Sequence, residues 1–288
     1  MPSPIIILAS DTGWHTDQLC RAVRARGHEP LLLPWEGNVS RLGVGSGISN
    51  TGHAMAEARA VLPRIIPSGS LEQLIYRVDT LHRLEAAGVR VMNSGRAIER
   101  TVDKAWTSAI LEQAGLPTPE TVACERADDA FVAFRRMGDV VVKPLFGSMG
   151  LGMTRVSDDD VAWRVFRAVE AMRGVFYVQR FVDHGGRDLR AFVIGDQVLG
   201  AIERTADDWR TNFSRGGKVA PCTLPAEWAV LAVRAARAVG AEYAGVDLLP
   251  DGHGGVYVLE VNGIPGWEGL QQATGLDVAG AIVGQLLA

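Results

Sequence analysis

Three oxygen-bearing side chains lie in two strand-like segments near the end of the chain, residues 245–249 and 256–262. A hairpin folded about the middle of the intervening turn puts Asp247 opposite Glu260, and the two-residue period of a strand puts Asn262 on the same face as Glu260. Two facing carboxylates among apolar neighbours repel each other unless a cation lies between them. Mg²⁺ held by carboxylates and nucleotide phosphates supplies such a charge. The alternative is a solvated hairpin with an acidic outer face.

A lysine, Lys143, ends the apolar segment 140–143 and is followed by a glycine-rich sequence at 147–152. The sequence lacks the glycine and lysine spacing of a Walker loop, and no helix follows it as a dinucleotide fingerprint requires. It is typical of a flap between two strands, whose backbone N–H groups can approach phosphate closely. A flexible connection with a solvated lysine is the alternative. The acidic hairpin and a second lysine, Lys104, favour a phosphate site.

Two further segments carry charges that suit a nucleotide or another anion. Asp188 and Arg190 share one strand face, where the aspartate could bind ribose hydroxyls and the arginine could bind phosphate. A surface ion pair of little energetic value is the alternative. Segment 208–218 places Arg210, Arg215 and Lys218 among turn-forming residues, which suits anion binding, although a solvated polar loop has the same composition.

The first 95 residues alternate strand-like and helix-like segments, which predicts a small α/β domain that starts with a βαβ unit. The expected strands are residues 5–9, 30–33 and 89–92, and the expected helices are residues 17–26 and 71–87. Residues 43–52 contain too much glycine and serine for a regular element, so we expect a mobile or ligand-facing loop there.

The rest of the chain follows a different pattern, with hairpin-like strands and few helices, which predicts an α+β fold and not a doubly wound parallel sheet. The expected helices are residues 98–114, 158–172 and 226–239, and the expected strands are residues 140–143, 152–156, 176–179, 189–194, 198–202, 245–249 and 256–261.

Composition excludes several classes of protein. With 29 basic and 33 acidic residues, the formal charge of −4 lacks the large electrostatic term on which non-specific nucleic-acid binding depends. No apolar run reaches the length of a membrane span, and the start has no basic region of a signal peptide. Three cysteines without metal-like spacing indicate neither a disulfide framework nor a zinc site. We therefore expect a cytoplasmic protein with neither nucleic acid nor membrane as partner.

Taken together, the motifs resemble those of the RimK-like branch of the ATP-grasp ligases, and the resemblance is closest over residues 103–277. Eight short motifs occur in the order of that family: Asp103-Lys104, Gly115-Leu116-Pro117-Thr118-Pro119, Val142-Lys143-Pro144 with its glycine flap, Val178-Gln179-Arg180-Phe181-Val182, Asp188-Leu189-Arg190, Arg210-Thr211-Asn212 through Arg215-Gly216-Gly217, Ala244-Gly245-Val246-Asp247 and Leu259-Glu260-Val261-Asn262. The chain departs from the family pattern at Arg180 and Ser214, where an acidic residue and a histidine are common.

The resemblance implies an α+β ATP-grasp fold of two antiparallel-sheet subdomains, preceded by a small α/β pre-ATP-grasp domain. The implied domains are residues 1–95 for the pre-ATP-grasp domain, 96–175 for the N-terminal subdomain with its flap, and 176–288 for the C-terminal subdomain with the metal site. ATP would lie between the two subdomains.

The resemblance also implies roles for individual residues. The implied phosphate contacts are Lys104, Lys143 and the flap residues Gly147, Ser148, Met149 and Gly150. Adenine would be bound by the backbone of Gln179, Arg180, Phe181 and Val182, ribose by Asp188, and further parts of the nucleotide by Arg210 and Asn212. The implied magnesium ligands are Asp247, Glu260 and Asn262, and the groups around the transferred phosphoryl group are Arg190, Arg204 and Arg215.

The implied reaction is ATP-dependent activation of a carboxylate as an acyl phosphate, followed by attack of an amine, with release of ADP and phosphate. ATP and Mg²⁺ are the implied cofactors, with Mn²⁺ as a substitute. We expect L-glutamate as the added amino acid and a carboxylate-bearing cofactor, peptide-like molecule or carrier as the acceptor. The alternatives are a ligase that acts on a carrier-bound amino acid in lysine biosynthesis, a small-molecule kinase and an ATP-binding regulatory module. The resemblance also implies a homodimer or homotetramer as the expected assembly.

Overall fold

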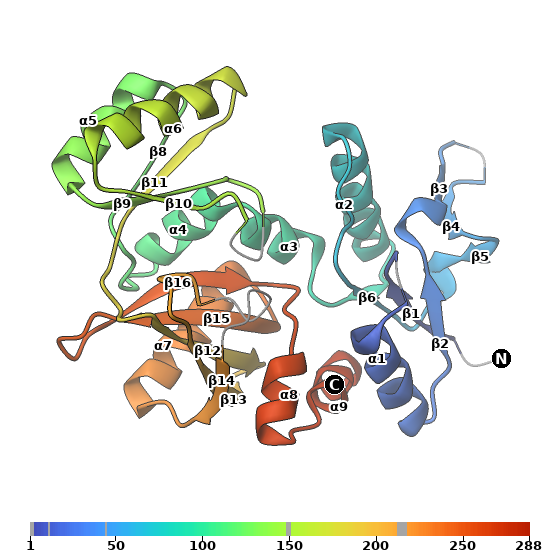
Figure 1. The fold of residues 1–288 in the computed structure, drawn as a ribbon. Coiled ribbons are helices and arrows are strands. Elements are labelled where there is room, and N and C mark those ends of the chain that lie inside the picture. The colour runs from blue at the N-terminus through green and yellow to red at the C-terminus, as the bar shows by residue number, and fades with distance from the viewer. Residues whose placement is uncertain (1–2, 11, 44, 148–150, 212–217) are drawn as a thin grey trace.

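The computed structural model describes residues 3–10, 12–43, 45–147, 151–211 and 218–288 of the 288-residue chain. An N-terminal lobe and a larger mass of two sheets lie side by side, with the C-terminal helices α8 (Glu268–Thr274) and α9 (Val278–Leu287) between them (Figure 1). Within these ranges no helix has the length and apolarity that a membrane crossing requires.

The N-terminal lobe is built on a parallel four-stranded sheet of order β2-β1-β6-β7. Its elements are β1 (Ile5–Leu8), α1 (Trp14–Ala25), β2 (Pro30–Leu33), β6 (Ala60–Pro63), α2 (Leu71–Ala86) and β7 (Arg90–Val91). All four residues of β1 are buried, because helices cover both faces of a parallel sheet. Ile5 and Ile7 pack toward α1 and α9, whereas Ile6 and Leu8 pack toward α2. The predicted small α/β domain is therefore present.

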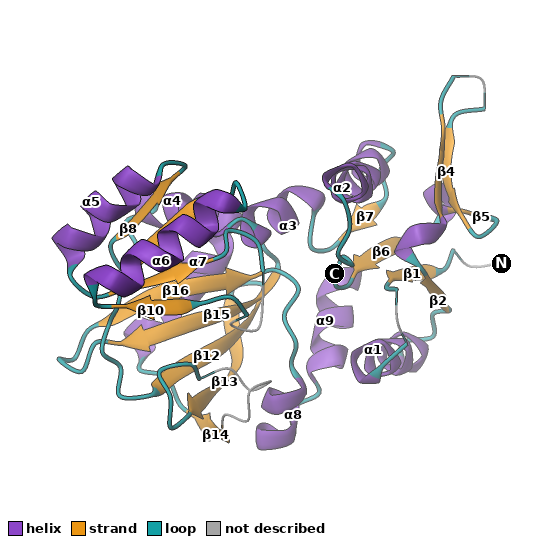
Figure 2. Cartoon of the chain, turned by 45° about the horizontal axis from the view of Figure 1, so that its top comes forward, coloured by secondary structure: helices purple, strands orange, loops and turns teal. Residues whose placement is uncertain are grey.

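The expected loop at residues 43–52 is partly wrong, because residues 47–50 form a strand. The small antiparallel sheet consists of β3 (Asn38–Arg41), β4 (Gly47–Asn50) and β5 (His53–Ala54), flanked by the 3-10 turns η1 (Trp35–Gly37) and η2 (Met55–Glu57). Asn50 donates to Asn38 Oδ1 at 2.7 Å inside this sheet. The glycines belong mainly to the turns, since Gly43, Gly45 and Gly52 have positive φ. Figure 2 shows this hairpin standing away from the rest of the lobe.

A second sheet, antiparallel and of order β10-β9-β11-β8, carries the glycine-rich flap. Its elements are β8 (Thr121–Cys124), α5 (Ala127–Met137), β9 (Val140–Lys143), β10 (Thr154–Val156), α6 (Asp159–Ala171) and β11 (Phe176–Arg180). Both helices lie on one face, and their apolar residues share a core with the strands (Figure 2). Because β11 pairs with β8 and β9, this sheet extends to Arg180, and the expected division after residue 175 stays a prediction.

The expected helix over residues 98–114 is two helices, α3 (Gly95–Val102) and α4 (Lys104–Gln113). The helix is interrupted at Asp103, whose backbone is extended. The Asp103 side chain accepts a hydrogen bond from Trp106 N at 3.0 Å. An aspartate at this position caps the free N–H groups of a helix. The break makes Lys104 the first residue of α4.

The third sheet is antiparallel, with the order β14-β13-β12-β15-β16. Its strands are β12 (Arg187–Ile194), β13 (Gln197–Thr205), β14 (Lys218–Cys222), β15 (Tyr243–Pro250) and β16 (Val256–Asn262), with α7 (Ala226–Val239) following β14. Alanines of α7 pack against β12, β15 and β16, together with Leu111 of α4. The two antiparallel sheets confirm the predicted α+β ATP-grasp architecture.

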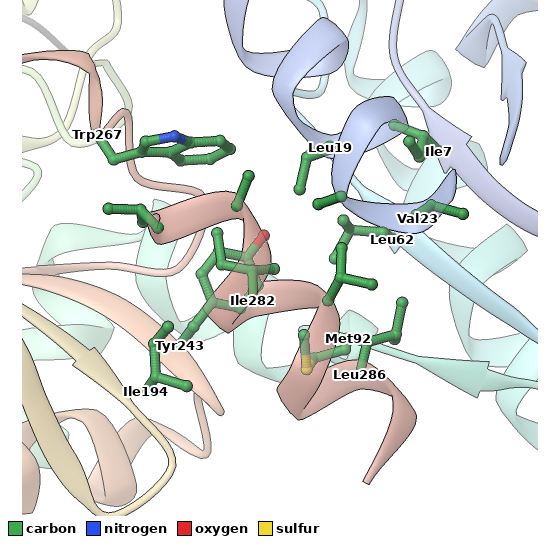
Figure 3. Close-up of a cluster of buried hydrophobic side chains, with 14 of the residues drawn as sticks. Ile7, Leu19, Val23, Leu62, Met92, Ile194, Tyr243, Trp267, Ile282 and Leu286 are labelled. Carbon is green, nitrogen blue, oxygen red and sulfur yellow. The ribbon is translucent and has the colours of Figure 1, made fainter. Parts of the chain in front are cut away.

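A shared core joins the C-terminal helices to the N-terminal lobe. Ile282 of α9 and Trp267 belong to the same buried cluster as Leu19 and Val23 of α1 (Figure 3). Nearby, Asn93 donates to the carbonyl oxygens of Tyr243 and Gly263 at 2.7 and 2.6 Å. The last helices therefore pack against the domain expected at residues 1–95, and fix it against the third sheet.

Candidate active site

The two predicted phosphate-binding lysines meet at one small cavity. Lys104 begins α4 and Lys143 ends β9, so two elements far apart in the sequence each contribute one ammonium group. Glu260 of β16 lies on the same wall. The cavity is lined by Thr101, Lys104, Thr107, Ser108, Lys143, Tyr177, Leu259 and Glu260.

Both lysines are partly desolvated. Burial, together with the charge of Lys104, lowers the pKa of Lys143 to about 8, against the attraction of Glu260 and Asp247. Burial likewise lowers the pKa of Lys104, whose ammonium donates to the Gly147 carbonyl at 2.7 Å. Gly147, where the flap begins, has a φ of 145°. The lysine of α4 thus contacts the base of the glycine-rich flap.

Four charged residues, of which Asp188, Arg204 and Asp247 are buried and Arg190 is half-buried, form a ladder across β13, β12 and β15. Arg204 donates to both oxygens of Asp188 at 2.6 Å, and Arg190 donates to the two oxygens of Asp247 at 2.6 and 2.7 Å. Arg204 Nη2 also lies 3.0 Å from Asp247 Oδ2, so Arg204 connects the two ion pairs. Burial would raise the pKa of Asp247, but the two arginines hold it at about 2. Burial opposes ionisation of Arg204, yet Asp247 and Asp188 raise its pKa.

The predicted register of the acidic hairpin is confirmed, since Asp247 lies opposite Glu260 and Gly245 lies opposite Asn262. Carboxylate and amide oxygens are the donors that Mg²⁺ prefers, together with water and phosphate oxygens. Glu260 and Asn262 are only half-buried, so this donor set fits the ion. Asp247 has both oxygens engaged by arginines, and sharing them with a cation requires those contacts to adjust. Among the described residues, no group of three or more His, Cys, Asp or Glu side chains could hold a metal ion.

The proposed ribose contact, Asp188, is almost fully buried. Besides Arg204 it accepts a hydrogen bond from Thr211 at 2.6 Å. Three protein hydrogen bonds therefore already occupy this carboxylate, and its role in ribose binding stays a prediction.

The segment expected to bind adenine continues from β11. The backbone N–H groups of Arg180 and Phe181 donate to Glu120 O and Asp139 O, so adenine recognition by these residues or Val182 would depend on other backbone groups. The Arg180 side chain donates to Glu120 at 3.0 Å.

The remaining predicted residues are placed as follows. Arg210 donates to Asp208 at 2.7 Å and extends over the ring of Trp209. Ser148, Met149, Gly150, Asn212 and Arg215 lie outside the described residues.

Sequence reasoning missed the neutral residues of the cavity, notably Ser108 and Tyr177. Helical spacing could have indicated Ser108, because it follows Lys104 by four residues on the same helix. Strand period could have indicated Tyr177, because it precedes Gln179 by two residues and shares its face.

Comparisons with known proteins identify relatives of this chain. Residues 101–286 match the model of the RimK-like ATP-grasp domain. The tetrahydromethanopterin:alpha-L-glutamate ligase of Methanosarcina acetivorans is 32% identical, over 95% of this chain and 95% of that protein. A probable alpha-L-glutamate ligase of Thioalkalivibrio sulfidiphilus is 36% identical, over 97% of this chain and 93% of that protein.

Solved structures share the fold. The ATP-grasp ligase PsnB, complexed with a minimal precursor, superimposes with a TM-score of 0.78 at 24% identity, over 99% of this chain and 100% of that chain. A RimK domain ATP-grasp protein from Sphaerobacter thermophilus gives a TM-score of 0.77 at 24% identity, with the same coverage of both chains.

The two antiparallel sheets and the match over residues 101–286 identify the class of protein as the ATP-grasp ligases. This chain belongs to the RimK-like ATP-grasp family. It is an enzyme that forms carbon–nitrogen bonds at the expense of ATP and releases ADP.

Proposed function

We propose that this chain is a magnesium-dependent ligase that adds L-glutamate to a carboxylate on a small cofactor or peptide-like acceptor. The observation that carries the proposal is the full-length similarity to relatives named alpha-L-glutamate ligases, two of which are named for tetrahydromethanopterin. The cavity supports it, because its lysines and carboxylate suit a polyphosphate with its metal ion.

Lys104 and Lys143 hold the phosphates of ATP in this proposal. Glu260, Asn262 and Asp247 hold Mg²⁺, with Mn²⁺ as a substitute ion. When bound, the ion supplies positive charge to the phosphate oxygens.

The acceptor carboxylate attacks the γ-phosphorus of ATP, the bond between that phosphorus and the bridging β–γ oxygen breaks, and ADP leaves. The glutamate nitrogen then attacks the acyl carbon of the acyl phosphate. The carbon–oxygen bond to phosphate breaks, and amide, phosphate and one proton are released. The guanidinium groups of Arg190 and Arg204 stabilise the charge that spreads over the phosphoryl oxygens, which is the main source of catalysis in phosphoryl transfer.

The test is to incubate the protein with ATP, Mg²⁺ and single amino acids (glutamate, aspartate, lysine or α-aminoadipate). Each mixture contains one acceptor: tetrahydromethanopterin, another pterin, a furan one-carbon carrier, a peptide with a carboxylate terminus or an acidic carrier protein. The proposal predicts ADP formation and a mass gain of one glutamyl residue only where glutamate is present, with Lys143→Met as the inactive control. Turnover with another amino acid but not with glutamate would show that the glutamate assignment is wrong.

The same mixtures distinguish the remaining candidates. A small-molecule kinase forms ADP and a phosphorylated product without any amine, and a regulatory module binds ATP without turnover. Lysine or α-aminoadipate as the only productive amino acid, with a carrier protein, identifies the lysine-biosynthesis type.

A further inference from the structure

Gln179 of β11 has a buried side chain that contacts a nucleotide-site lysine directly. Lys143 Nζ lies 2.6 Å from the Gln179 side chain. Because an ammonium group only donates, the atom that faces it is the amide oxygen. The other end of the amide, Nε2, then donates to Thr121 Oγ1 at 3.0 Å and to Tyr177 Oη at 3.1 Å. The protein therefore fixes the orientation of this amide.

The two neighbouring hydroxyl groups, those of Thr121 and Tyr177, continue the hydrogen bonding. Thr121 donates its own proton to Pro119 O at 2.8 Å, which leaves its oxygen free to accept from Gln179. Tyr177 Oη accepts from Gln179 and lies 2.8 Å from Ser108 Oγ, a hydrogen bond in which either hydroxyl can donate. The hydrogen bonds form one continuous chain from Lys143 to Ser108.

This chain connects the elements that carry the two lysines. Ser108 lies one helical turn after Lys104 on α4, and both residues line the cavity. Helix α4 packs against α7 and β16 of the third sheet, whereas Tyr177 and Lys143 belong to the second sheet. The Ser108–Tyr177 bond therefore crosses between the two halves of the site.

We infer that Gln179 is a positioning residue for ATP, which acts through Lys143, and that Tyr177 and Ser108 set the distance between the two lysine-bearing elements. The inference rests on the proposed assignment of Lys104 and Lys143 to the phosphates. Gln179 orients the lysine with its side chain, a role distinct from the adenine contact expected of its backbone.

The experiment measures the dissociation constant of a non-hydrolysable ATP analogue by calorimetry, with Mg²⁺ present, as a function of pH. Gln179→Met keeps the volume but removes the acceptor, and should weaken binding about tenfold, as the loss of one hydrogen bond to a charged group predicts. Gln113→Met, at the exposed end of α4, is the matched control and should bind like wild type.

The second quantity is the midpoint pH at which affinity for the ATP analogue falls. A change in packing alone does not move this midpoint. Gln179→Met should shift that midpoint downward because Lys143 loses a partner for its charged form, and Gln179→Glu should shift it upward because a carboxylate favours that form. Wild-type affinity and midpoint in both variants would overturn the inference.

Two further variants keep the test decisive. If Gln179→Met does not fold, Tyr177→Phe, which removes a single oxygen, should still weaken analogue binding several-fold, and unchanged binding in that variant overturns the inference. Lys143→Met tests the underlying assignment separately. Weak binding in Lys143→Met with wild-type binding in Gln179→Met refutes only the positioning role, whereas wild-type binding in Lys143→Met refutes the proposed phosphate site itself.

Discussion

Arg190 and Asp247 form a two-point ion pair between neighbouring strands, with Nε and Nη2 donating to Oδ1 and Oδ2 at 2.6 and 2.7 Å. They are direct register partners in β12 and β15. Arg204 and Asp188 repeat the arrangement between β13 and β12. Together with Glu260 and the two lysines, four cations face three carboxylates at this site. The excess positive charge suits an anionic nucleotide.

Arg204 should be essential for folding as well as for the site. Arg204→Met leaves Asp188 and Asp247 short of a buried partner, and breaking such a pair costs about 3–5 kcal/mol. Urea denaturation would measure this loss. Arg187→Met, which removes the exposed arginine paired with Glu203 on the same sheet, should change the free energy of unfolding by under about 0.5 kcal/mol. Equal effects of the two substitutions would contradict the account of the ladder.

Affinity for ATP should fall as the pH rises through about 8, where Lys143 loses its proton in the free protein. Below that pH the ammonium is charged and attracts phosphate. Lys143→Met should bind a non-hydrolysable analogue weakly at every pH and lack this step. Titration calorimetry from about one pH unit below to one above the pKa checks it, and an identical profile in both proteins would remove Lys143 from the phosphate site.

Glu260→Gln should lower turnover by at least about 100-fold, since removing one group that stabilises transition-state charge has effects of that order. The free energy of unfolding should change by under about 1 kcal/mol, because the side chain is half-buried and the substitution keeps its shape. Chelated protein should regain activity with Mg²⁺ or Mn²⁺, and the variant should need more of either ion. Glu125→Gln, at an exposed position, serves as the control. Wild-type turnover of Glu260→Gln at limiting Mg²⁺ would exclude this residue as a ligand.

His15 should make the domain junction sensitive to acid. Burial and the charge of Arg64 lower its pKa from 6.5 to about 4, and its neutral ring accepts a hydrogen bond from Trp267 N at 3.1 Å. The unfolded chain therefore binds this proton more readily, so the contribution to stability is complete above pH 6.5 and is lost as the pH falls through about 4.

The matched variant is His15→Gln, which keeps an acceptor but does not titrate. Its free energy of unfolding should depend less on pH across that window than the wild-type value does, whereas exposed His53→Gln should leave the slope unchanged. The same slope in wild type and His15→Gln would refute the effect.

Sequence patterns predicted the elements whose signals are local. The apolar runs of β1 and β9 have a short length and flanking turn residues that indicate buried strands, and folding the hairpin about the middle of its turn placed Asp247 opposite Glu260. Motif order predicted the lysines, because each follows a short distinctive sequence. The strand β4 escaped prediction, since its pairing with β3 overrides the low strand propensity of glycine and serine.

Side-chain contacts between residues far apart in the sequence could not be predicted from the sequence. The resemblance named Arg190, Arg204, Asp188 and Asp247 as site residues, but only the pairing of β12 with both β13 and β15 shows that they neutralise one another. The hydrogen-bonded chain Lys143–Gln179–Tyr177–Ser108 likewise depends on how α4 packs beside the second sheet. No spacing of residues in the sequence gives the distance between that helix and that sheet.

The most direct measurement of the central claim follows oxygen from the acceptor into phosphate. The acceptor that supports glutamate addition is prepared with ¹⁸O in its carboxylate and incubated with ATP, Mg²⁺ and glutamate, and the released phosphate is analysed by mass spectrometry. Formation of an acyl phosphate predicts one labelled oxygen in the phosphate for each amide formed. Amide formation with unlabelled phosphate would contradict the mechanism.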